Sequence, residues 1–198
     1  DNQAKASLRT NDIDFYLYKE EKLIDTVHKQ IGLRTLSLCR ENDEYGQEFC
    51  FEINGVKIFA MGANYVPMES LIARDTNERL EHLIKSCIFA NFNCIRVWGG
   101  AYYPSDYFYE LCDKYGLIVW QDLMVACANV WLTEKMEQEF ICEATYNIKR
   151  IRHHASLGLI CGNNEMEEAI CFWDCADGND PLVRQDYLRL YEDIFPNL

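Results

Sequence analysis

The strongest constraint on this 198-residue chain is a repeated order of short apolar segments and longer amphipathic ones in its second half. Apolar segments at 93–98, 116–122 and 157–162 each precede a helical segment or a long loop, and a further strand surrounds KIFAMGAN (57–64). Near-continuous apolar strands joined in this way indicate a parallel sheet covered by helices. The pattern predicts an α/β fold, either an open doubly wound sheet or half of a closed barrel. No glycine-rich phosphate loop follows these strands, which argues against nucleotide-binding versions.

Helical periodicity fills the intervals between these strands. Residues 76–90 have apolar side chains at helical spacing, with Asp75 or Thr76 as the expected N-cap. Ser105 is the expected cap of a helix that continues to residue 115. A long amphipathic helix over 133–153 carries its apolar residues on one face, namely Met136, Phe140, Ala144, Ile148 and Ile151.

The first part of the chain has the period-2 alternation of β-strands. Residues 13–38 alternate around a charged turn at Lys19 to Lys22, which predicts a β-hairpin. A second hairpin is predicted over 48–62, because Asn54-Gly55 between two alternating runs is a strong two-residue turn signal.

The net charge is −13, from 19 Lys and Arg residues against 32 Asp and Glu residues. This charge opposes binding to nucleic acid and to anionic membranes, so the expected ligand is neutral or cationic. The sequence contains neither an apolar stretch of membrane-spanning length nor a signal-peptide pattern at its start. We therefore expect a cytoplasmic location.

Ten cysteines are scattered along the chain, mostly inside apolar runs. This placement favours buried free thiols over a disulfide framework. The closest pair, Cys171 and Cys175, has no second pair of ligands nearby at zinc spacing. The sequence therefore predicts no metal site and no cofactor.

Polar and aromatic residues follow the predicted strands at their carboxyl ends. In parallel architectures, ligands bind at this edge of the sheet. The residues placed there are Asn64 and Tyr65, Arg96 to Trp98, Gln121 and Asp122, and Asn163 to Glu165. An edge rich in amides and aromatic rings suits a sugar, which needs hydrogen bonds to its hydroxyls and apolar contact with its C–H faces. His153 and His154 precede the last strand, so we expect them at the opposite end in a structural role.

The position of Glu165 has two interpretations. It opens a helical segment, and carboxylates near helix N-termini interact favourably with the helix dipole. This explanation suits Glu167 and Glu168, which we expect to be solvated. It accounts less well for Asn163 and Asn164, whose amides are placed to hold a polar ligand.

Three segments resemble glycoside hydrolase family 2 in order and spacing: NGVKIFAMGANYVP (54–67), NCIRVWGGAYYPSDYFYELCDKYGLIVWQDLMVACA (93–128) and NIKRIRHHASLGLICGNNE (147–165). The elements RVWGG, WQD and GNNE are similar to those of the β-mannosidase branch. The resemblance covers about residues 15 to 175. It implies that residues 46–198 form the N-terminal half of a (β/α)8 TIM barrel. Residues 1–45 would be the last strands of a preceding immunoglobulin-like β-sandwich domain, so the chain would be an internal fragment.

The resemblance also implies roles for individual residues. Glu165, expected to end the fourth strand, matches the general acid/base, and Asn164 matches the amide that holds the sugar's 2-hydroxyl. Trp98 and Trp173 match aromatic residues that line the pocket of the terminal mannose.

Arg96 matches an arginine that helps to organise the catalytic carboxylates, while Asn64 and Asp122 match other positions on the rim. Two positions depart from the family pattern. Ala101 replaces a more usual glycine after RVWGG, and Ala155 replaces the proline usual in HHPSL. Neither is a proposed catalytic group, although Ala101 is expected to affect the loop that carries Trp98.

The implied reaction is the retaining hydrolysis of terminal, non-reducing β-D-mannose residues. Such a reaction needs a protonated carboxyl and a second, ionised carboxylate about 5 Å away. Burial among tryptophans and a negative neighbour would raise the pKa of Glu165. The family's nucleophile ends the seventh strand, but only 33 residues follow Glu165 here, too few for three more strand–helix units. We therefore expect the nucleophile outside this chain, which alone would be inactive, with the remaining polypeptide or an oligomeric partner covering its exposed edges.

Three alternatives stay open. The first is a β-galactosidase, β-glucuronidase or exo-glucosaminidase specificity within the same family. The second is a non-catalytic sugar-binding fragment. The third is an unrelated parallel α/β protein in which Glu165 simply begins a helix; a fourth strand at the edge of an open sheet, with Glu165 on the outer surface, would favour it.

Overall fold

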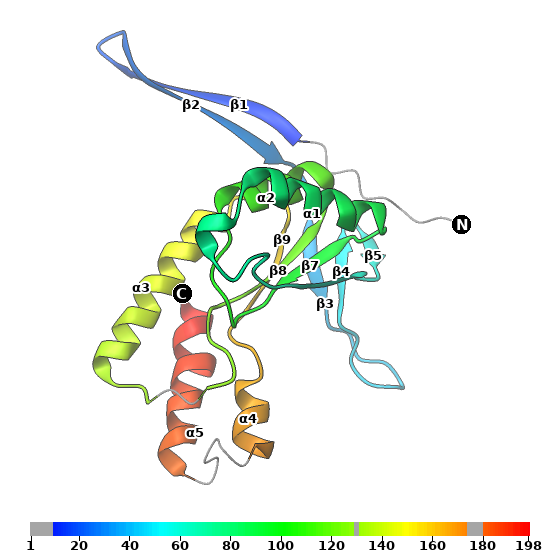
Figure 1. Cartoon of the computed structure of the whole chain (residues 1–198), viewed down its shortest axis with the longest axis vertical. Coiled ribbons are helices and arrows are strands. Elements are labelled where there is room, and N and C mark those ends of the chain that lie inside the picture. Colours follow the sequence, from blue (N-terminus) through cyan, green and yellow to red (C-terminus); the bar gives the residue numbers. More distant parts are fainter. Residues whose placement is uncertain (1–9, 129–130, 174–179) are drawn as a thin grey trace.

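The computed structural model describes residues 10–128, 131–173 and 180–198. These residues form a projecting two-stranded hairpin, a three-stranded antiparallel sheet and a four-stranded parallel sheet flanked by helices (Figure 1). The α/β class and the parallel sheet predicted from the sequence are therefore confirmed.

The hairpin consists of β1 (Thr10–Lys19) and β2 (Lys22–Gly32). Its two turn residues, Glu20 and Glu21, both have positive φ, at 46° and 67°. This is the backbone twist that a two-residue hairpin turn requires. The predicted hairpin is thus present, but it ends at residue 32, short of the predicted residue 38.

The next strand, β3 (Leu36–Cys39), pairs instead with β4 (Cys50–Ile53), which in turn pairs with β5 (Val56–Ile58). Asn54 and Gly55 form the turn between β4 and β5 with φ of 51° and 78°, so the second predicted hairpin is confirmed. β3 and β4 lie on either side of the predicted domain boundary between residues 45 and 46. That boundary stays a prediction.

The parallel sheet has the order β6-β7-β8-β9. Its strands are β6 (Gly62–Tyr65), β7 (Cys94–Val97), β8 (Ile118–Asp122) and β9 (Leu157–Cys161). The predicted strand around residues 57–64 is divided, since β5 ends at Ile58 and β6 begins at Gly62 in a different sheet. All four parallel strands present their carboxyl ends at one edge.

The principal helices are α1 (Asn77–Phe89), α2 (Asp106–Tyr115), α3 (Glu134–Ile151), α4 (Met166–Phe172) and α5 (Pro181–Tyr187). Two short 3₁₀ turns are η1 (Ile72–Arg74) and η4 (Phe195–Asn197), and a π-helical segment, η3 (Leu188–Ile194), continues directly from α5. Thr76 caps α1 by accepting a hydrogen bond from the Arg79 backbone N–H, as predicted. The helices from α5 onward were not predicted.

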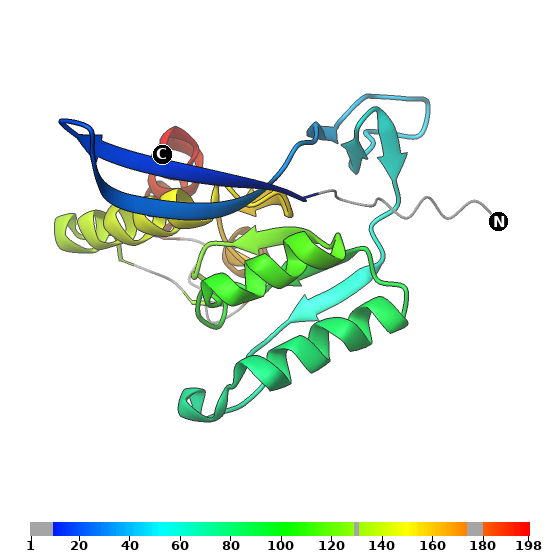
Figure 2. The same cartoon turned by 90° about the horizontal axis from the view of Figure 1, so that it is seen from above.

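Figure 2 shows α1 and α2 side by side along one face of the parallel sheet. The main core lies between these helices and the strands, and it includes Ile84, Val97, Phe108 and Val119. A second cluster joins the two larger sheets by packing Phe51 and Ile53 of β4 against Cys94 and Ile118. The antiparallel sheet is therefore fixed to the parallel one through apolar contact.

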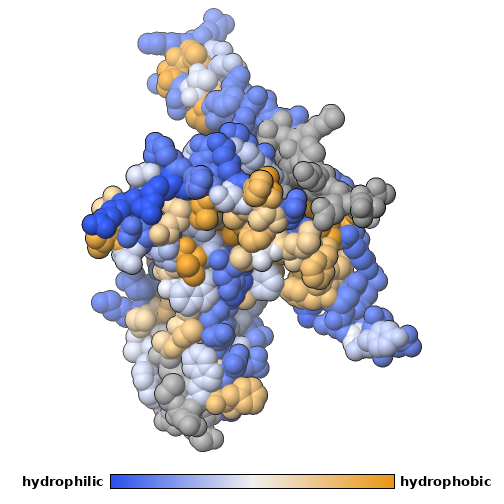
Figure 3. Space-filling view, turned by 45° about the vertical axis from the view of Figure 1, so that its right-hand side comes forward, coloured by the Kyte–Doolittle hydropathy of each residue, from blue (hydrophilic) through white to orange (hydrophobic). Residues whose placement is uncertain are grey.

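The β1–β2 hairpin projects away from both sheets and carries exposed apolar side chains, which are visible in orange in Figure 3. The exposed large hydrophobic residues of the hairpin are Phe15, Tyr16, Leu17, Tyr18, Leu23, Ile24 and Val27. Among the described helices, none has the length and apolar character needed to cross a membrane.

Candidate active site

Four polar side chains meet at the carboxyl edge of the parallel sheet, and Arg96 is the centre of the group. Its Nη2 donates to Asp122 Oδ2 at 2.6 Å and to Asn164 Oδ1 at 2.7 Å. Its Nε donates to Asp122 Oδ1 at 3.2 Å, and Nη1 donates to Asn64 Oδ1 at 3.3 Å. These contacts join β6, β7, β8 and the segment after β9. Four residues predicted separately from the sequence therefore form one network.

The strand register explains the assembly. Asn64 lies directly opposite Arg96 in the β6–β7 pairing, and Arg96 lies opposite Trp120 in the β7–β8 pairing. Asp122 follows Trp120 by two positions, so both side chains are on the same face of the sheet. Asn64 also lines an open groove between the end of β6 and α1.

Asp122 is completely buried and fully hydrogen-bonded. Besides Arg96, the Trp120 indole N–H donates to Oδ1 at 3.0 Å and the Gly99 backbone N–H donates to Oδ2 at 3.1 Å. Desolvation raises the pKa of the Asp122 carboxyl, while Arg96 and the other donors act in the opposite direction. A buried carboxylate held in this way fixes the plane of the Arg96 guanidinium.

Trp120 is a member of the site that the sequence analysis did not select. The Arg96 guanidinium lies 5.8 Å from the centre of the Trp120 ring, within cation–π range. On another side, Phe49 packs against Trp120 with ring centres 5.8 Å apart. The signal was present in the WQD element, but strand alternation was needed to see that the tryptophan shares a face with Asp122.

Asn164 is buried and held by both backbone and side chain. Its N–H donates to the Val125 carbonyl at 2.9 Å, and it forms an isolated parallel bridge with Ala126. Because the amide oxygen accepts from Arg96, the Nδ2 group is directed to the other side, where it contacts Cys127 Sγ at 3.4 Å. Arg96 thus fixes the orientation of the Asn164 amide.

Glu165 differs from the prediction in two respects. It does not end the fourth strand, since β9 ends at Cys161 and Glu165 is the N-cap residue of α4. Its backbone is in the left-handed region, with φ of 61°, and its side chain is exposed instead of buried. Because the backbone turns at Glu165, the side chain that is buried is that of the next residue, Met166.

The Glu165 carboxylate does not cap α4 within the described part of the chain. Its Oε2 instead accepts a contact from Cys127 Sγ at 3.5 Å. Cys127 also has positive φ, at 54°, and the sequence analysis did not single it out. Non-glycine residues in this conformation carry backbone strain and are often found at functional sites.

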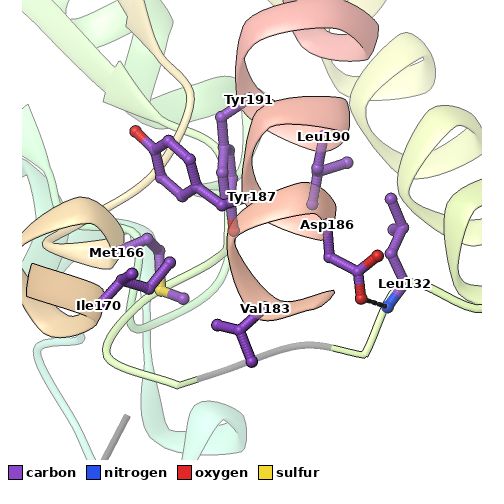
Figure 4. A pocket seen from close by; sticks show the side chains of 8 residues that line it. All are labelled: Leu132, Met166, Ile170, Val183, Asp186, Tyr187, Leu190 and Tyr191. Carbon is purple, nitrogen blue, oxygen red and sulfur yellow. Dashed lines mark hydrogen bonds between the residues drawn. The ribbon is translucent and has the colours of Figure 1, made fainter. Parts of the chain in front are cut away.

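Apolar packing holds the start of α4 in place. Met166 and Ile170 face a narrow pocket whose other walls include Val183, Leu190 and Tyr191 (Figure 4). Met166, Leu190 and Tyr191 are all buried in one cluster. The C-terminal helices therefore support the backbone immediately after Glu165.

The two predicted pocket tryptophans lie outside the hydrogen-bond network. Trp98 follows β7, and its N–H donates to the Tyr65 carbonyl at 3.2 Å. Its indole covers Gly100 so closely that a Cβ there would lie 2.0 Å from the ring. Trp173 is the C-cap residue of α4, with its N–H donating to Ala169. Both residues are partly buried.

The opposite end of the sheet has a structural polar cluster. His154 is buried, with Nδ1 2.7 Å from Asp113 Oδ2, and the Ser156 N–H donates to Asp113 Oδ1 at 2.7 Å. These contacts tie α2 to the segment before β9. They agree with the structural role expected for His154.

The cysteines are only partly as predicted. All those in the described residues are free thiols, and Cys94 and Cys112 are buried. Cys127, Cys142 and Cys171 are exposed, however, so the expectation of general burial was wrong. They lie in a loop or on outward-facing positions of helices whose apolar residues are too few to bury every side. Cys175 lies outside the described residues.

The chain matches β-mannosidases over most of its length. It is 36% identical over 194 residues to β-mannosidase B from Aspergillus flavus, covering 94% of this chain. It is 38% identical over 166 residues to a β-mannosidase from Capra hircus, covering 82% of this chain. The chain spans 23% and 19% of the lengths of these curated relatives. No family model matches it.

Solved structures give the same result. The β-D-mannosidase from Dictyoglomus thermophilum superposes with a TM-score of 0.79 and 35% identity, over 92% of this chain and 22% of that one. A β-glucuronidase from Parabacteroides merdae superposes with a TM-score of 0.62 at 15% identity, over 74% of this chain and 18% of that one, which shows a shared fold alone.

The alternative of an unrelated parallel α/β protein required an edge position for the fourth strand and an exposed Glu165. Both are observed, since β9 is an edge strand and Glu165 is exposed. Half of a barrel would leave the same open edge, however, so these two features do not separate the alternatives. Homology decides against the unrelated α/β protein: the chain belongs to the β-mannosidase branch of glycoside hydrolase family 2.

Proposed function

We propose that the complete polypeptide containing this chain is a retaining exo-β-mannosidase, in which Glu165 is the general acid/base. The observation that carries the proposal is the network of Asn64, Arg96, Asp122 and Asn164 next to Glu165, in a chain homologous to β-mannosidases. The substrate is a β-mannoside with a terminal, non-reducing mannose.

In the first step, Glu165 donates a proton to the glycosidic oxygen while a second carboxylate attacks the anomeric carbon. The bond to the leaving group breaks, and a glycosyl ester forms on that second carboxylate. Glu165, now ionised, then accepts a proton from the water that hydrolyses the ester. The exposed position of Glu165 at the start of α4 suits a group that must reach both leaving group and water.

Asn164 is suited to hold the 2-hydroxyl of the mannose. Arg96 occupies its amide oxygen, and the only contact of its Nδ2 group among the described residues is the weak one to Cys127. A sugar hydroxyl is a better acceptor for that N–H than a thiol. A hydrogen bond to the 2-hydroxyl that strengthens in the transition state lowers the barrier rather than only improving binding.

The second carboxylate comes from another part of the polypeptide in this proposal. The four parallel strands in consecutive order support the N-terminal half of a (β/α)8 barrel, which three further strand–helix units and a final strand would close. The exposed hairpin supports an origin in a preceding immunoglobulin-like domain. Trp98 and Trp173 would line the mannose pocket after the barrel closes.

The test is Glu165→Gln in the complete polypeptide. We expect the hydrolysis of alkyl β-mannosides to be lost by a factor of about 100 to 10,000, the range for general acid/base catalysis, with little change in sugar affinity. An aryl mannoside with a good leaving group needs less protonation, so its first step should continue and the glycosyl enzyme should accumulate. Glu168→Gln, at an exposed neighbour on α4, is the matched control and should be fully active. Normal hydrolysis of alkyl mannosides by the Glu165 variant would refute the assignment.

The other specificities of the family are separated by comparing kcat/KM for β-mannosides, β-galactosides, β-glucuronides and β-glucosaminides. A preference for mannose of tenfold or less would count against the proposed substrate. The remaining alternative, a sugar-binding fragment without catalysis, is favoured only if the complete polypeptide binds mannosides and turns over none of them.

A further inference from the structure

We propose that Cys39, Cys50, Glu48 and Glu52 form a binding site for a thiophilic divalent cation of the Zn²⁺ class, at the far end of the β3–β4 pair. In the three-stranded sheet, Cys39 is directly opposite Cys50. Ligand atoms of Cys39, Glu48 and Cys50 all lie within 4.8 Å of one another. The site is separate from the carboxyl edge of the parallel sheet, and it does not depend on the proposed hydrolase activity.

Strand alternation gathers the ligands on one face. In β4, Cys50 and Glu52 alternate with Phe51 and Ile53, whose side chains are buried in the apolar cluster on the opposite face. Glu48 precedes the strand and reaches the same face, where its carboxylate contacts Cys50 Sγ. The two cysteines and the two glutamates are all partly buried. The donors are therefore partly shielded from solvent and partly accessible to it.

The distances match the edges of a tetrahedral site. Cys39 Sγ lies 3.7 Å from Glu52 Oε2, and Cys50 Sγ lies 3.8 Å from Glu48 Oε2. Ligands bound to Zn²⁺ at about 2.3 Å for sulfur and about 2.1 Å for oxygen would be separated by about 3.6 Å in a tetrahedron. Cys39, Glu48 and Cys50 would need little movement to surround one ion, whereas the Glu52 carboxylate is outside the group of ligand atoms within 4.8 Å of one another and would have to turn toward it.

The chemistry of the donors selects the cation. Two thiolates favour Zn²⁺ over Mg²⁺ or Ca²⁺, which prefer oxygen ligands. On binding, each thiol releases its proton to solvent and forms a bond from sulfur to the metal, so no redox step is involved. The ion would join the end of β3 to the start of β4 and close the intervening loop, residues 40–49.

The Lys57 ammonium group would compete with the metal ion for the Glu48 carboxylate. Its Nζ contacts Glu48 at 2.8 and 3.0 Å and lies 3.8 Å from Glu41, so it occupies the carboxylate that the ion needs. The site therefore makes opposite predictions for two neighbouring side chains. Removing Glu48 should weaken binding, and removing Lys57 should strengthen it.

The test uses Co²⁺ as a spectroscopic probe, added to the reduced complete polypeptide without oxygen, followed by displacement with Zn²⁺. We expect a sulfur-to-cobalt charge-transfer band at one equivalent that is lost in Cys39→Ser and in Cys50→Ser. Cys142→Ser, at an exposed thiol on α3, is the matched control and should keep the band. Glu48→Gln should weaken Zn²⁺ binding by at least about tenfold, the loss seen even for outer partners of metal ligands.

Lys57→Met keeps the proposal falsifiable if a cysteine variant fails to fold, because it leaves both cysteines and both glutamates in place and removes only the competing ammonium group. We expect this variant to bind Zn²⁺ more tightly than the parent. Absence of the band in the parent, equal loss of the band in Cys142→Ser, or unchanged affinity in both Glu48→Gln and Lys57→Met would overturn the site.

Discussion

At the scale of single residues, the contact between Trp98 and Gly100 makes a sharp prediction. A methyl group at position 100 would lie 2.0 to 2.4 Å from three ring atoms of Trp98, so the indole must move. We expect Gly100→Ala to lower kcat/KM for mannosides in the complete polypeptide, chiefly through a higher KM, because the indole would line the sugar pocket. Steady-state kinetics with the parent and the variant measure this effect.

A double-mutant cycle separates this effect from a general disturbance of the loop. In a Trp98→Ala background the clash is absent, so adding Gly100→Ala should change kcat/KM by less than about twofold. A loss equal to that in the parent background would show that Gly100 acts independently of Trp98.

His153 gives a prediction for pH. Its pKa lies below the ordinary value of 6.5 because of partial burial, the adjacent His154 and Lys29 of β2, while Asp113 and the backbone around Arg150 act in the opposite direction. A histidine with a lowered pKa in the folded state contributes stability above its unfolded pKa and loses it as the pH falls through the folded pKa. We therefore expect the thermal midpoint to fall between about pH 7 and about pH 5, and to fall less in His153→Gln. Parallel curves for both proteins would contradict this.

The candidate site shows which of its features could be predicted from residue patterns and which could not. Asn64, Arg96, Asp122 and Asn164 could be placed at one edge because each lies in or just after the C-terminal half of a recognisable apolar strand. The sequence could not show which atoms of the Arg96 guanidinium meet which partner, because this depends on the strand register and side-chain rotamers. It also could not show that Cys127 contacts Glu165, because both residues are in loop conformations with positive φ.

At the scale of secondary-structure elements, turn and cap signals were reliable and the parallel sheet was predicted, but the pairing of the antiparallel strands β3 and β4 was not. The Asn54-Gly55 turn and the cap at Thr76 are encoded within a few residues, and both were predicted correctly. The pairing of β3 with β4 joins segments separated by a ten-residue loop, and the two alternating runs gave no indication that they belong to one sheet. The proximity of Cys39 and Cys50 was missed for the same reason.

Met166 gives a prediction at this scale, since it anchors α4 to the C-terminal helices. Met166 is 2% exposed and packs with Leu190 and Tyr191. We expect Met166→Ala to destabilise the fold by about 2–5 kcal/mol, the usual cost of a large-to-small change in a core. Because Glu165 precedes it directly, kcat should fall as well. Thermal unfolding and alkyl-mannoside kinetics measure the two effects.

Met136→Ala is the control for that substitution, because Met136 is 39% exposed on α3. A change at such a position usually costs less than about 0.5 kcal/mol. If both variants were equally stable, the packing of α4 against the C-terminal helices would not hold the start of that helix.

At the scale of the whole molecule, the projecting hairpin has apolar side chains that the rest of the chain does not cover. Phe15 and Val27 are cross-strand partners, and they are 56% and 43% exposed. Adjacent apolar side chains on an exposed two-stranded ribbon favour association with another surface. We expect the 198-residue chain alone to self-associate, despite its net charge of −13, because the apolar contact is local and the charge is spread over the chain.

The double substitution Phe15→Lys and Val27→Lys tests the role of this surface. It should reduce the apparent mass of the chain in analytical ultracentrifugation, because lysines on both strands oppose edge-to-edge and face-to-face packing. The matched control is Leu182→Lys with Leu188→Lys, at two exposed leucines near the C-terminus, which should leave self-association unchanged. In the complete polypeptide the hairpin would pack inside a preceding domain, so there the same double substitution should lower the thermal midpoint instead. An unchanged apparent mass in the chain together with an unchanged midpoint in the complete polypeptide would show that this surface is covered in neither context.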